Sequence, residues 1–497
     1  MISLSPARRV SLACVIAAIL TAFCGPTAWA QRLSSQEKAE KLCSLCHLFP
    51  DPNILDRTTW ETSTLPLMAK ILGIKLSLTN QPGGENILKD WSDITQLYLQ
   101  ESPAVPFPQP DHEKIRTGLK QFKPEKTPFQ TKLQSVTLVQ ADPDRKILFI
   151  GDAEAKRLEV LNFEGKWQSG LALSNSATGL AFQSNTAWIS MIGSVTPSDS
   201  PLGVIATAQW TGNQLTNLQP ALTGLRRPIG TLFADMDGDG DEDLVITTYG
   251  HTMGRFSWWE NRGTNKYVEH VLIDRPGAIK AVITDLNKDG KPDVIVLMAQ
   301  AKEGVFALIN NGKDGFTEQP LLQFHPGWGS ASFEWKDFNG DGFNDLLVAN
   351  GDNGEYASCL RPYHGLRLYL NNGSNQFKEA WFFPLNGAYK TITSDFDGDG
   401  DLDIAAISFF PDYANTPEES FVYLENLGGM KYQPWTFEQS WRGRWITMDA
   451  ADLDGDGDLD MVLGGYDRSP FKVREDIQQL WKTNGTSLMI LRNQRKP

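Results

Sequence analysis

Two cysteines and a histidine near the amino terminus form a compact group of reactive side chains. Cys43 and Cys46 are separated by two residues, and His47 follows directly. Thiols at positions i and i+3 share one helical turn, so both reach the vinyl groups of a haem while the adjacent imidazole binds the iron. A redox dithiol or half of a zinc site is the alternative, but no second cysteine pair exists to complete a zinc site. The spacing therefore predicts covalent haem c.

The second axial ligand of this haem is expected between the motif and the next predicted helix. Met68 is the only methionine in that interval. A methionine that simply fills a hydrophobic core is the alternative interpretation. His112 is a competing ligand, but it lies beyond the second helix in a proline-rich segment. We therefore expect cofactor binding by Cys43, Cys46, His47 and Met68.

Five other segments carry oxygen-bearing side chains in one repeated pattern. Positions 1, 3, 5 and 9 are Asp or Asn, and position 6 is always glycine, which allows the sharp turn that wraps ligands around a hard cation. The predicted metal ligands are Asp235, Asp237, Asp239, Asp243, Asp285, Asn287, Asp289, Asp293, Asp337, Asn339, Asp341, Asp345, Asp395, Asp397, Asp399, Asp403, Asp452, Asp454, Asp456 and Asp460.

Calcium is the cation that fits this pattern best. A strand-like run follows each loop, whereas an EF-hand needs flanking helices and a glutamate at position 12. The alternative is five acidic turns that bind nothing. Several carboxylates in one tight loop repel one another unless a cation neutralises them, so we expect Ca2+.

The spacing of the five loops predicts the elements that position them. Their first aspartates are 50, 52, 58 and 57 residues apart, which is long enough for a four-stranded propeller blade. A fourth strand is expected, for example, at residues 267–273. Two upstream repeats, near residues 136–150 and 179–190, keep the strand pattern without the acidic loop. The fold prediction is mainly β: a seven-bladed β-propeller with calcium-binding loops, preceded by a small all-α domain.

The all-α domain is predicted from two helices. Ser34 and Glu37 form a capping-box signature that opens the first helix, which continues to Cys46. Leu88, Trp91, Ile94 and Tyr98 form the apolar stripe of the second. A proline-rich linker is expected at residues 102–128.

The region from residue 129 to the carboxyl terminus resembles the FG-GAP or VCBS repeats of bacterial secreted proteins and, more distantly, the propeller of integrin alpha subunits. This resemblance implies that the calcium sites are structural. The first two blades depart from the pattern, which leaves calcium there in doubt. The amino-terminal part resembles the short cytochrome c domains that some bacteria fuse to such propellers, on Cys43, Cys46, His47 and Met68.

The first 30 residues have the pattern of a signal peptide. Arg8 and Arg9 precede an apolar run at residues 10–23, and Ala28 and Ala30 provide a small-x-small cleavage site. The run is shorter than the ~20 residues of a membrane-spanning helix. We therefore expect a periplasmic or secreted protein without a membrane span after cleavage. Its parts are residues 1–30 (signal peptide), 31–101 (cytochrome c-like domain), 102–128 (linker) and 129–497 (propeller).

Charge limits the classes of partner. The sequence has 46 Lys+Arg against 60 Asp+Glu and a formal net charge of −14, which argues against nucleic-acid binding. The leading hypothesis is one-electron transfer with a redox partner protein or small-molecule donor, the propeller acting as a docking or ligand-binding platform. An adhesion module that binds carbohydrate or protein is an alternative.

A periplasmic oxidoreductase or another enzyme is a further alternative, although no catalytic constellation is recognisable and catalytic residues stay unassigned. Two insertions, at residues 350–364 and 408–419, are expected to project from one propeller face. The side chains expected to converge near the axis are Tyr356, Arg361, His364, Tyr413 and Arg468.

The last repeat lacks a fourth strand. After Asp460 the sequence offers strands at residues 461–464 and 488–491 and then ends before another can form. We predict that residues 129–133 pair with residues 488–491, so that both ends of the propeller share one blade and no sheet edge is left open.

Overall fold

A computed structural model describes residues 33–75, 83–264, 266–354, 360–467 and 473–495. The predicted signal peptide therefore lies outside the described residues, as do Tyr356, Cys359 and Arg468. Within the described part, no helix has both the length and the apolar character needed to cross a membrane.

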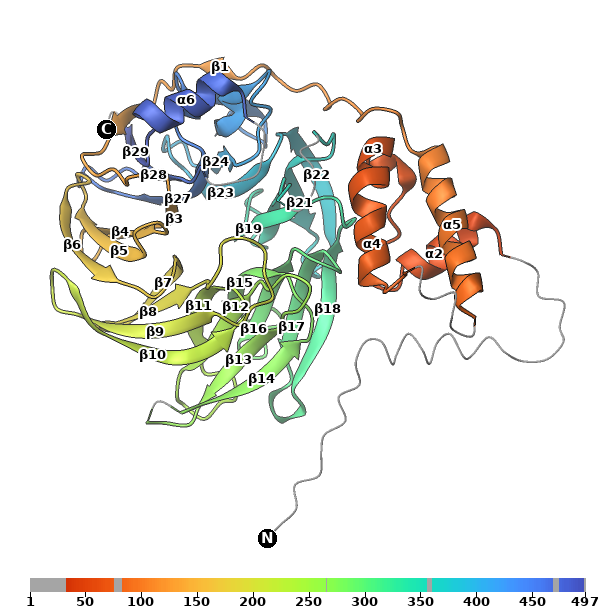
Figure 1. The fold of residues 1–497 in the computed structure, drawn as a ribbon. Helices are drawn as coiled ribbons and strands as arrows, with labels where there is room; N and C mark the ends of the chain where they lie inside the picture. Colours follow the sequence, from red (N-terminus) through yellow and green to blue (C-terminus); the bar gives the residue numbers. More distant parts are fainter. Residues whose placement is uncertain (1–32, 76–82, 265, 355–359, 468–472, 496–497) are drawn as a thin grey trace, which may run out of the picture.

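Most of the chain forms seven antiparallel sheets arranged in a ring, each with four strands except one that gains a fifth (Figure 1). Blades 1 and 2 contain β3 (Val136–Asp142), β4 (Ile147–Asp152), β5 (Arg157–Asn162), β6 (Trp167–Ala172), β7 (Ala177–Gln183), β8 (Thr186–Met191), β9 (Gly203–Trp210) and β10 (Leu215–Leu225). Blades 3 and 4 contain β11 (Pro228–Ala234), β12 (Asp243–Thr248), β13 (Phe256–Asn261), β14 (Tyr267–Ile273), β15 (Ala278–Thr284), β16 (Asp293–Met298), β17 (Gly304–Asn310) and β18 (Phe316–Gln323). The prediction of seven blades is confirmed.

The remaining blades complete the ring. Blade 5 contains β19 (Ser330–Lys336), β20 (Asp345–Asn350), β21 (Gly365–Asn371) and β22 (Phe377–Pro384). Blade 6 contains β23 (Ala388–Ser394), β24 (Asp403–Ser408), β25 (Phe421–Asn426) and β26 (Tyr432–Thr436), with β1 (Arg116–Thr117) added in parallel to β26. Blade 7 contains β27 (Trp445–Ala451), β28 (Asp460–Gly465), β29 (Leu488–Asn493) and β2 (Phe122–Lys126).

Apolar contacts between neighbouring sheets hold the ring together. The second strand of every blade is buried along its whole length or nearly so, as in β12 and β16. Between blades 3 and 4, Val245, Phe256 and Trp258 pack in one cluster with Val294 and Phe306. Each fully buried side chain of this kind stabilises the fold by about 1.5–3 kcal/mol, so the blades stabilise one another cooperatively.

The ring is closed by a strand other than the predicted one. Both chain ends do share blade 7, but β2 pairs antiparallel with β29, whereas residues 129–133 connect β2 to blade 1. The predicted pairing of residues 129–133 is wrong. Burial of Phe122 favours β2 over residues 129–133 as the closing strand, because the Phe122 ring packs against Phe396 and Tyr423. The strand also contains Pro124, which an edge strand tolerates.

This strand places part of the predicted linker inside the propeller. Residues 102–128 include β2, so the four-stranded blades begin at Phe122 instead of residue 129, and they also include β1, which adds to the edge of blade 6. The preceding segment is also held to the blades, since Asn386 donates a hydrogen bond to the side chain of Gln109 at 2.7 Å.

The helical part precedes the propeller. It contains α2 (Ser35–Cys43), η1 (Pro52–Ile54), α3 (Arg57–Thr59), η2 (Trp60–Thr64), α4 (Leu65–Ile71) and α5 (Gly84–Glu101). Ser34 and Glu37 form the predicted capping box at the start of α2. Trp60, Leu65, Ile94 and Tyr98 are buried in one cluster, which joins α5 to the helices before it.

A further helix, α6 (Glu475–Asn484), was not predicted from the sequence and lies between β28 and β29. Short 3-10 turns are η4 (Gly312–Asp314), η5 (Pro417–Ser420) and η6 (Ser440–Arg442). Ile477 and Trp481 pack α6 against Tyr413.

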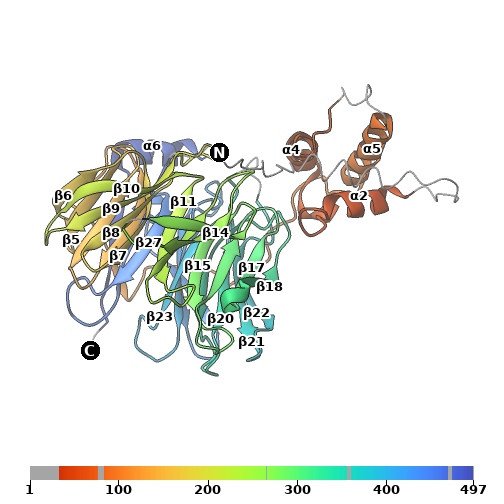
Figure 2. The ribbon, with the colours of Figure 1, turned by 90° about the horizontal axis from the view of Figure 1, so that it is seen from below.

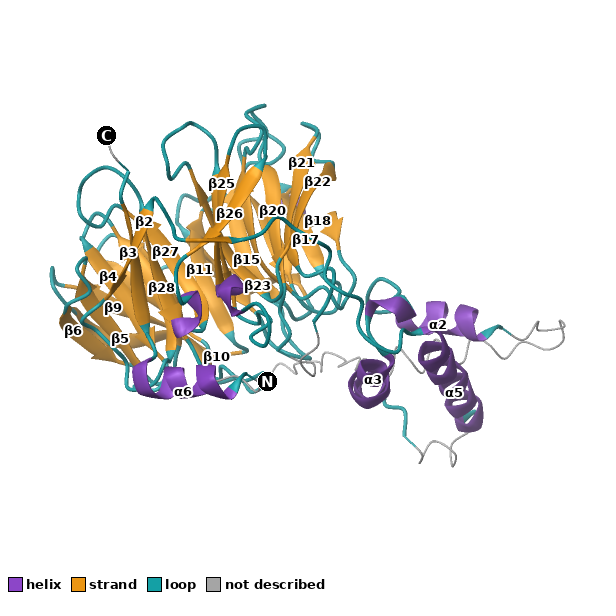
Figure 3. Cartoon of the chain, turned by 90° about the horizontal axis from the view of Figure 1, so that it is seen from above, coloured by secondary structure: helices purple, strands orange, loops and turns teal. Residues whose placement is uncertain are grey.

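The helical part lies beside one end of the propeller. Figures 2 and 3 show α2 and α5 at the end where α6 lies. This end is formed by the loops that join the second strand to the third and by those that join one blade to the next, whereas the acidic loops join the first strand to the second at the other end. A direct contact is the hydrogen bond from the Tyr363 hydroxyl to the carbonyl oxygen of Ile54, at 2.9 Å.

Candidate haem cavity and cation-binding loops

A cavity of about 650 Å3 lies between the helices and the propeller. Its walls include all four residues predicted to hold haem, namely Cys43, Cys46, His47 and Met68. The helical side is otherwise apolar, with Leu55, Trp60 and Leu65 among its side chains. The volume lies in the usual range for cofactor pockets, about 300–1,000 Å3. Residues from separate helices are thus brought to one cavity.

The hydrogen bonding and burial of His47 determine which ring nitrogen carries its proton. Its Nδ1 lies 2.8 Å from the carbonyl oxygen of Leu48, so Nδ1–H donates there and Nε2 carries the free lone pair. Burial lowers the pKa of His47, with the nearby His325 acting in the same direction. The imidazole is therefore neutral at pH 7, which is the form that binds metal.

The two cysteines are free thiols with different surroundings. Cys43 is half-buried and Cys46 is exposed. Burial raises the pKa of the Cys43 thiol, which keeps it protonated. The Tyr98 hydroxyl lies 3.9 Å from its sulfur and donates a hydrogen bond to the carbonyl oxygen of Pro50 at 2.7 Å. Tyr98 on α5 thus holds the turn that follows the motif.

Met68 and its competitor lie in different places. Met68 is on α4 and lines the cavity. His112 packs on the ring of Phe383 at 5.1 Å, with its Nε2 3.8 Å from a carboxylate oxygen of Glu419. His112 is not among the residues that line the cavity, so its position does not suit an iron ligand. The cavity therefore presents two thiols, a neutral imidazole and a thioether, a donor set that fits haem c.

The propeller side of the cavity is polar and positively charged. Its residues come from the loops that join β10 to β11, β12 to β13, β14 to β15 and β16 to β17, and from loops farther along the same end. They include Arg226, His251, Arg255, Arg275, Lys302 and Glu303. No local sequence signal indicated this wall, because no motif connects these loops.

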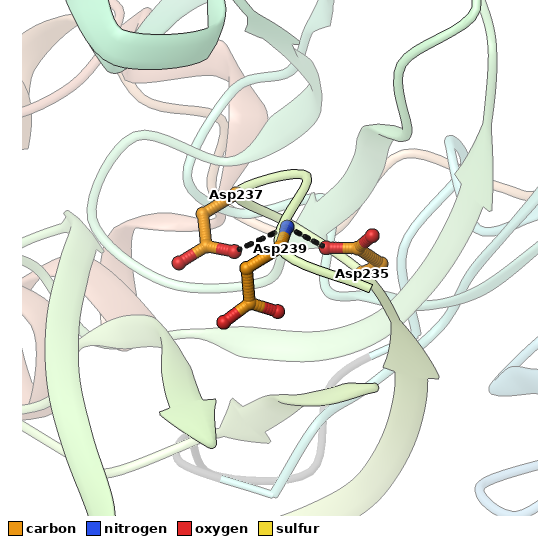
Figure 4. A group of neighbouring side chains, drawn as sticks. All are labelled: Asp235, Asp237 and Asp239. Atoms are coloured by element: carbon orange, nitrogen blue, oxygen red, sulfur yellow. Dashed lines mark hydrogen bonds between the residues drawn. The ribbon is translucent and has the colours of Figure 1, made fainter. Parts of the chain in front are cut away.

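At the other end of the propeller, the acidic loops bring carboxylates together. In blades 3, 6 and 7 the residues at positions 1, 3 and 5 have carboxylate oxygens within 4.8 Å of one another. Figure 4 shows this arrangement for Asp235, Asp237 and Asp239, where the backbone N–H of Asp239 donates to both other carboxylates at 3.1 and 3.2 Å. Gly240 at position 6 has φ of 94°, which a side chain would strain. These three clusters can each hold one hard cation.

The carboxylate at position 9 has different contacts. In blade 3, Asp243 accepts the backbone N–H of Met236 at 2.9 Å and that of Asn261 at 2.8 Å, one on each oxygen. The equivalent carboxylates make the same pair of bonds in the four other blades that have an acidic loop; they are Asp293, Asp345, Asp403 and Asp460. Position 9 therefore ties the acidic loop to the end of the third strand.

The bonds that the asparagine beside position 9 makes to the acidic loop were not predicted from the sequence. It recurs at the end of the third strand and also donates its side-chain amide to the carbonyl oxygen at position 8 of the loop. The five residues are Asn261, Asn310, Asn371, Asn426 and Asn493. Their recurrence once per acidic repeat was the available signal.

Burial also raises the pKa of several position-9 carboxyls, to about 6 for Asp403. Blade 4 differs again, because Lys291 Nζ lies 2.8 Å from Asp289 and already places one positive charge at its loop. The five loops are thus similar in backbone and unequal in charge.

The side chains proposed to form an enzyme site occupy two separate regions. Arg361 and His364 are buried, and Arg361 donates to the carbonyl oxygen of Gly327 at 2.7 Å. Tyr413 packs edge-on against Trp481 of α6, with ring centroids 5.3 Å apart. The described members of the set therefore form no common site, although Arg361 reaches the cavity wall.

A known repeat family matches the part of the sequence that contains the acidic loops. The FG-GAP-like repeat matches residues 235–296, 285–348 and 395–463, which include all five acidic loops. The chain therefore carries FG-GAP-like repeats within a seven-bladed β-propeller. No curated protein matches the sequence.

Three of the solved structures that the chain matches are distant from it in sequence. Sqt1 of Saccharomyces cerevisiae is 11% identical, covering 77% of this chain and 100% of its own, with a TM-score of 0.45. The computationally designed Ika8 protein is 13% identical, covering 72% and 83%, with a TM-score of 0.40. A luciferin-regenerating enzyme is 11% identical, covering 58% and 88%, with a TM-score of 0.37.

Proposed function

We propose that this protein is an exported c-type haem protein that transfers single electrons, with a calcium-stabilised propeller as its docking or ligand-binding platform. The observation that supports the proposal is the shared cavity of Cys43, Cys46, His47 and Met68. A bound haem supplies a one-electron redox couple. The electron comes from a redox partner protein or a small-molecule donor.

The residues of the cavity have distinct tasks in this proposal. Cys43 and Cys46 hold the cofactor through thioether bonds, and the Leu48 carbonyl orients His47 so that Nε2 is available to the iron. Met68 provides the sixth ligand. The apolar helical side and the facing propeller loops limit access of water to the cavity. The same two protein ligands, His47 and Met68, are therefore retained in both oxidation states.

Calcium binds the clusters at positions 1, 3 and 5 and makes the propeller rigid. The position-9 carboxylates keep each loop joined to its third strand, as described above for Asp243. Export to the periplasm or the exterior agrees with this proposal, because millimolar calcium and c-type haem are both compatible with that compartment.

The test is expression of the full chain together with a c-type haem maturation system. Haem should stay with the polypeptide after denaturation, and Cys43→Ala with Cys46→Ala should abolish this attachment. Cys359→Ala is the matched control and should leave attachment unchanged. If the wild-type chain carries no covalent haem while a known c-type cytochrome matures in the same cells, the proposal is wrong.

A further inference from the structure

The cavity has two walls from different parts of the chain. The helical wall contains the attachment motif, and the opposite wall consists of loops at one end of blades 3 to 5. On a porphyrin, the vinyl groups that react with cysteines and the propionate groups occupy different edges. A haem tied to Cys43 and Cys46 therefore directs its carboxylates away from those thiols.

The propeller wall has an excess of positive charge. Arg226, Arg255, Arg275 and Lys302 all line the cavity, and the protein as a whole has a net charge of −14. Burial raises the pKa of Glu303 in this wall to about 8, so its carboxyl is mostly uncharged at pH 7 and offsets little of that charge. Asp274 and Asp352 are the other acids on the wall.

These cations differ in how far the protein already pairs them. Arg275 makes two hydrogen bonds to Glu318, at 3.1 and 2.7 Å, and lies over the ring of Phe306, so its role is structural. Lys302 is exposed and forms no ion pair with any described residue.

Arg361, which also lines the cavity, is buried and donates to the carbonyl oxygen of Gly327, whereas Arg226 and Arg255 have weaker protein contacts. Arg226 donates its Nε to the carbonyl oxygen of Asp199 at 3.2 Å, and among described residues it too has no ion pair. Arg255 is 3.4 Å from Glu269 and 3.8 Å from Asp274, on a side chain that is 44% exposed. Arg226, Arg255 and Lys302 therefore retain donors for an added anion.

We infer that Arg226, Arg255 and Lys302 of the propeller bind the propionate carboxylates of the haem, so that the propeller completes the haem site. This inference rests on the proposed haem function. Arginine forms forked hydrogen bonds with carboxylates, and a partly enclosed cavity strengthens such charge pairs relative to bulk water. The propeller thereby tunes the haem in addition to its role as a platform.

The experiment measures the haem midpoint potential of Arg226→Gln, Arg255→Gln, Lys302→Gln and the triple variant. Removing positive charge beside the haem stabilises the ferric form, so each potential should fall, and that of the triple variant most. Propionate ionisation should also shift to higher pH, visible in the pH dependence of the potential. Covalent haem content should stay at the wild-type value.

Arg262→Gln is the matched control, because Arg262 is in blade 3 beside the acidic end and pairs with Glu260. Its potential should equal that of the wild type. Arg226→Lys and Arg255→Lys should restore most of the potential, since they retain the charge. Lys302→Gln alters one exposed side chain and keeps the test valid if a larger variant folds poorly.

Two results would overturn the inference. One is a fully haem-loaded triple variant with the wild-type potential and pH dependence. The other is a change in the wild-type potential on addition of succinate at constant ionic strength, because the cations would then be binding an external carboxylate. Absence of haem from the wild-type chain would instead refute the proposed function itself.

Discussion

Removal of calcium should destabilise the propeller by an amount that the loop geometry sets. In blades 3, 6 and 7, three carboxylates have oxygens within 4.8 Å of one another. Even in bulk water, three such pairs of unit charges repel by about 3 kcal/mol per loop. A chelator leaves this repulsion in the folded state, whereas calcium replaces it with attraction.

The size of the effect on melting follows from mass action. At a free calcium concentration of about 100 Kd, each site adds about 2.7 kcal/mol, and three sites add about 8 kcal/mol. The propeller runs from Phe122 to Asn493. With an unfolding entropy of about 2.1 cal/mol/K per residue, this stabilisation raises the melting temperature by about 10 °C.

Scanning calorimetry of the full chain in excess calcium and in excess chelator tests this number. Asp237→Asn should behave unusually, because Asn287 and Asn339 already occupy the same position in blades 4 and 5. It should reduce the calcium-dependent increase, and it should raise the melting temperature in chelator by removing one repelling charge.

Asp243→Asn should lower the melting temperature in both conditions, because its two oxygens accept backbone N–H groups from Met236 and Asn261. Asp144→Asn, in a blade without an acidic loop, is the control. The reasoning is refuted if wild-type curves in calcium and chelator coincide, or if Asp237→Asn lowers the melting temperature equally in both.

Three further predictions concern the haem, ring closure and the buried acid of the cavity. Met68→Ala should keep covalent haem and lose the weak far-red absorption band expected of Met/His ligation; survival of that band would mean that another residue is the sixth ligand. A chain that begins after β2 (Phe122–Lys126) should melt at a lower temperature and aggregate, because β29 then has an open edge. A chain that begins at residue 119 keeps β2 and should do neither. Equal behaviour of the two chains would contradict the ring closure. Burial raises the pKa of Glu303 from 4.5 to about 8. Between these pH values the folded state keeps a proton that the unfolded state releases. The free energy of unfolding should therefore fall by up to about 5 kcal/mol as pH rises from 4.5 to 8. Glu303→Gln should flatten that decline in a denaturant titration repeated at several pH values, and an unchanged slope would assign the decline to other groups.

Features that repeat or that lie within a few residues of one another were predictable from the sequence. Seven blades followed from strand patterns at a regular period, and the grouping of Asp235, Asp237 and Asp239 followed from their places in one turn. The capping box of Ser34 and Glu37 is equally local. In each case the interacting atoms are close in the chain, so composition and spacing are sufficient.

Ring closure required the tertiary structure. The segment that forms β2 contains Pro124 and charged residues, so nothing local distinguishes it from a linker. Its pairing partner, β29, is more than 350 residues away, and burial of Phe122 against Phe396 and Tyr423 selects it. The energy of such a strand pairing depends on which side chains of distant segments meet in the fold. Local strand propensity carries no information about those contacts.

The cavity also combines residues that the sequence identifies with contacts that only the fold creates. The sequence is sufficient to predict a haem-attachment motif at Cys43, Cys46 and His47, with Met68 as the only methionine between that motif and the second helix. Only the fold decided that these residues face a charged propeller wall. That wall comes from loops of successive blades, which are brought to one side by closure of the ring and by docking of the helices on it.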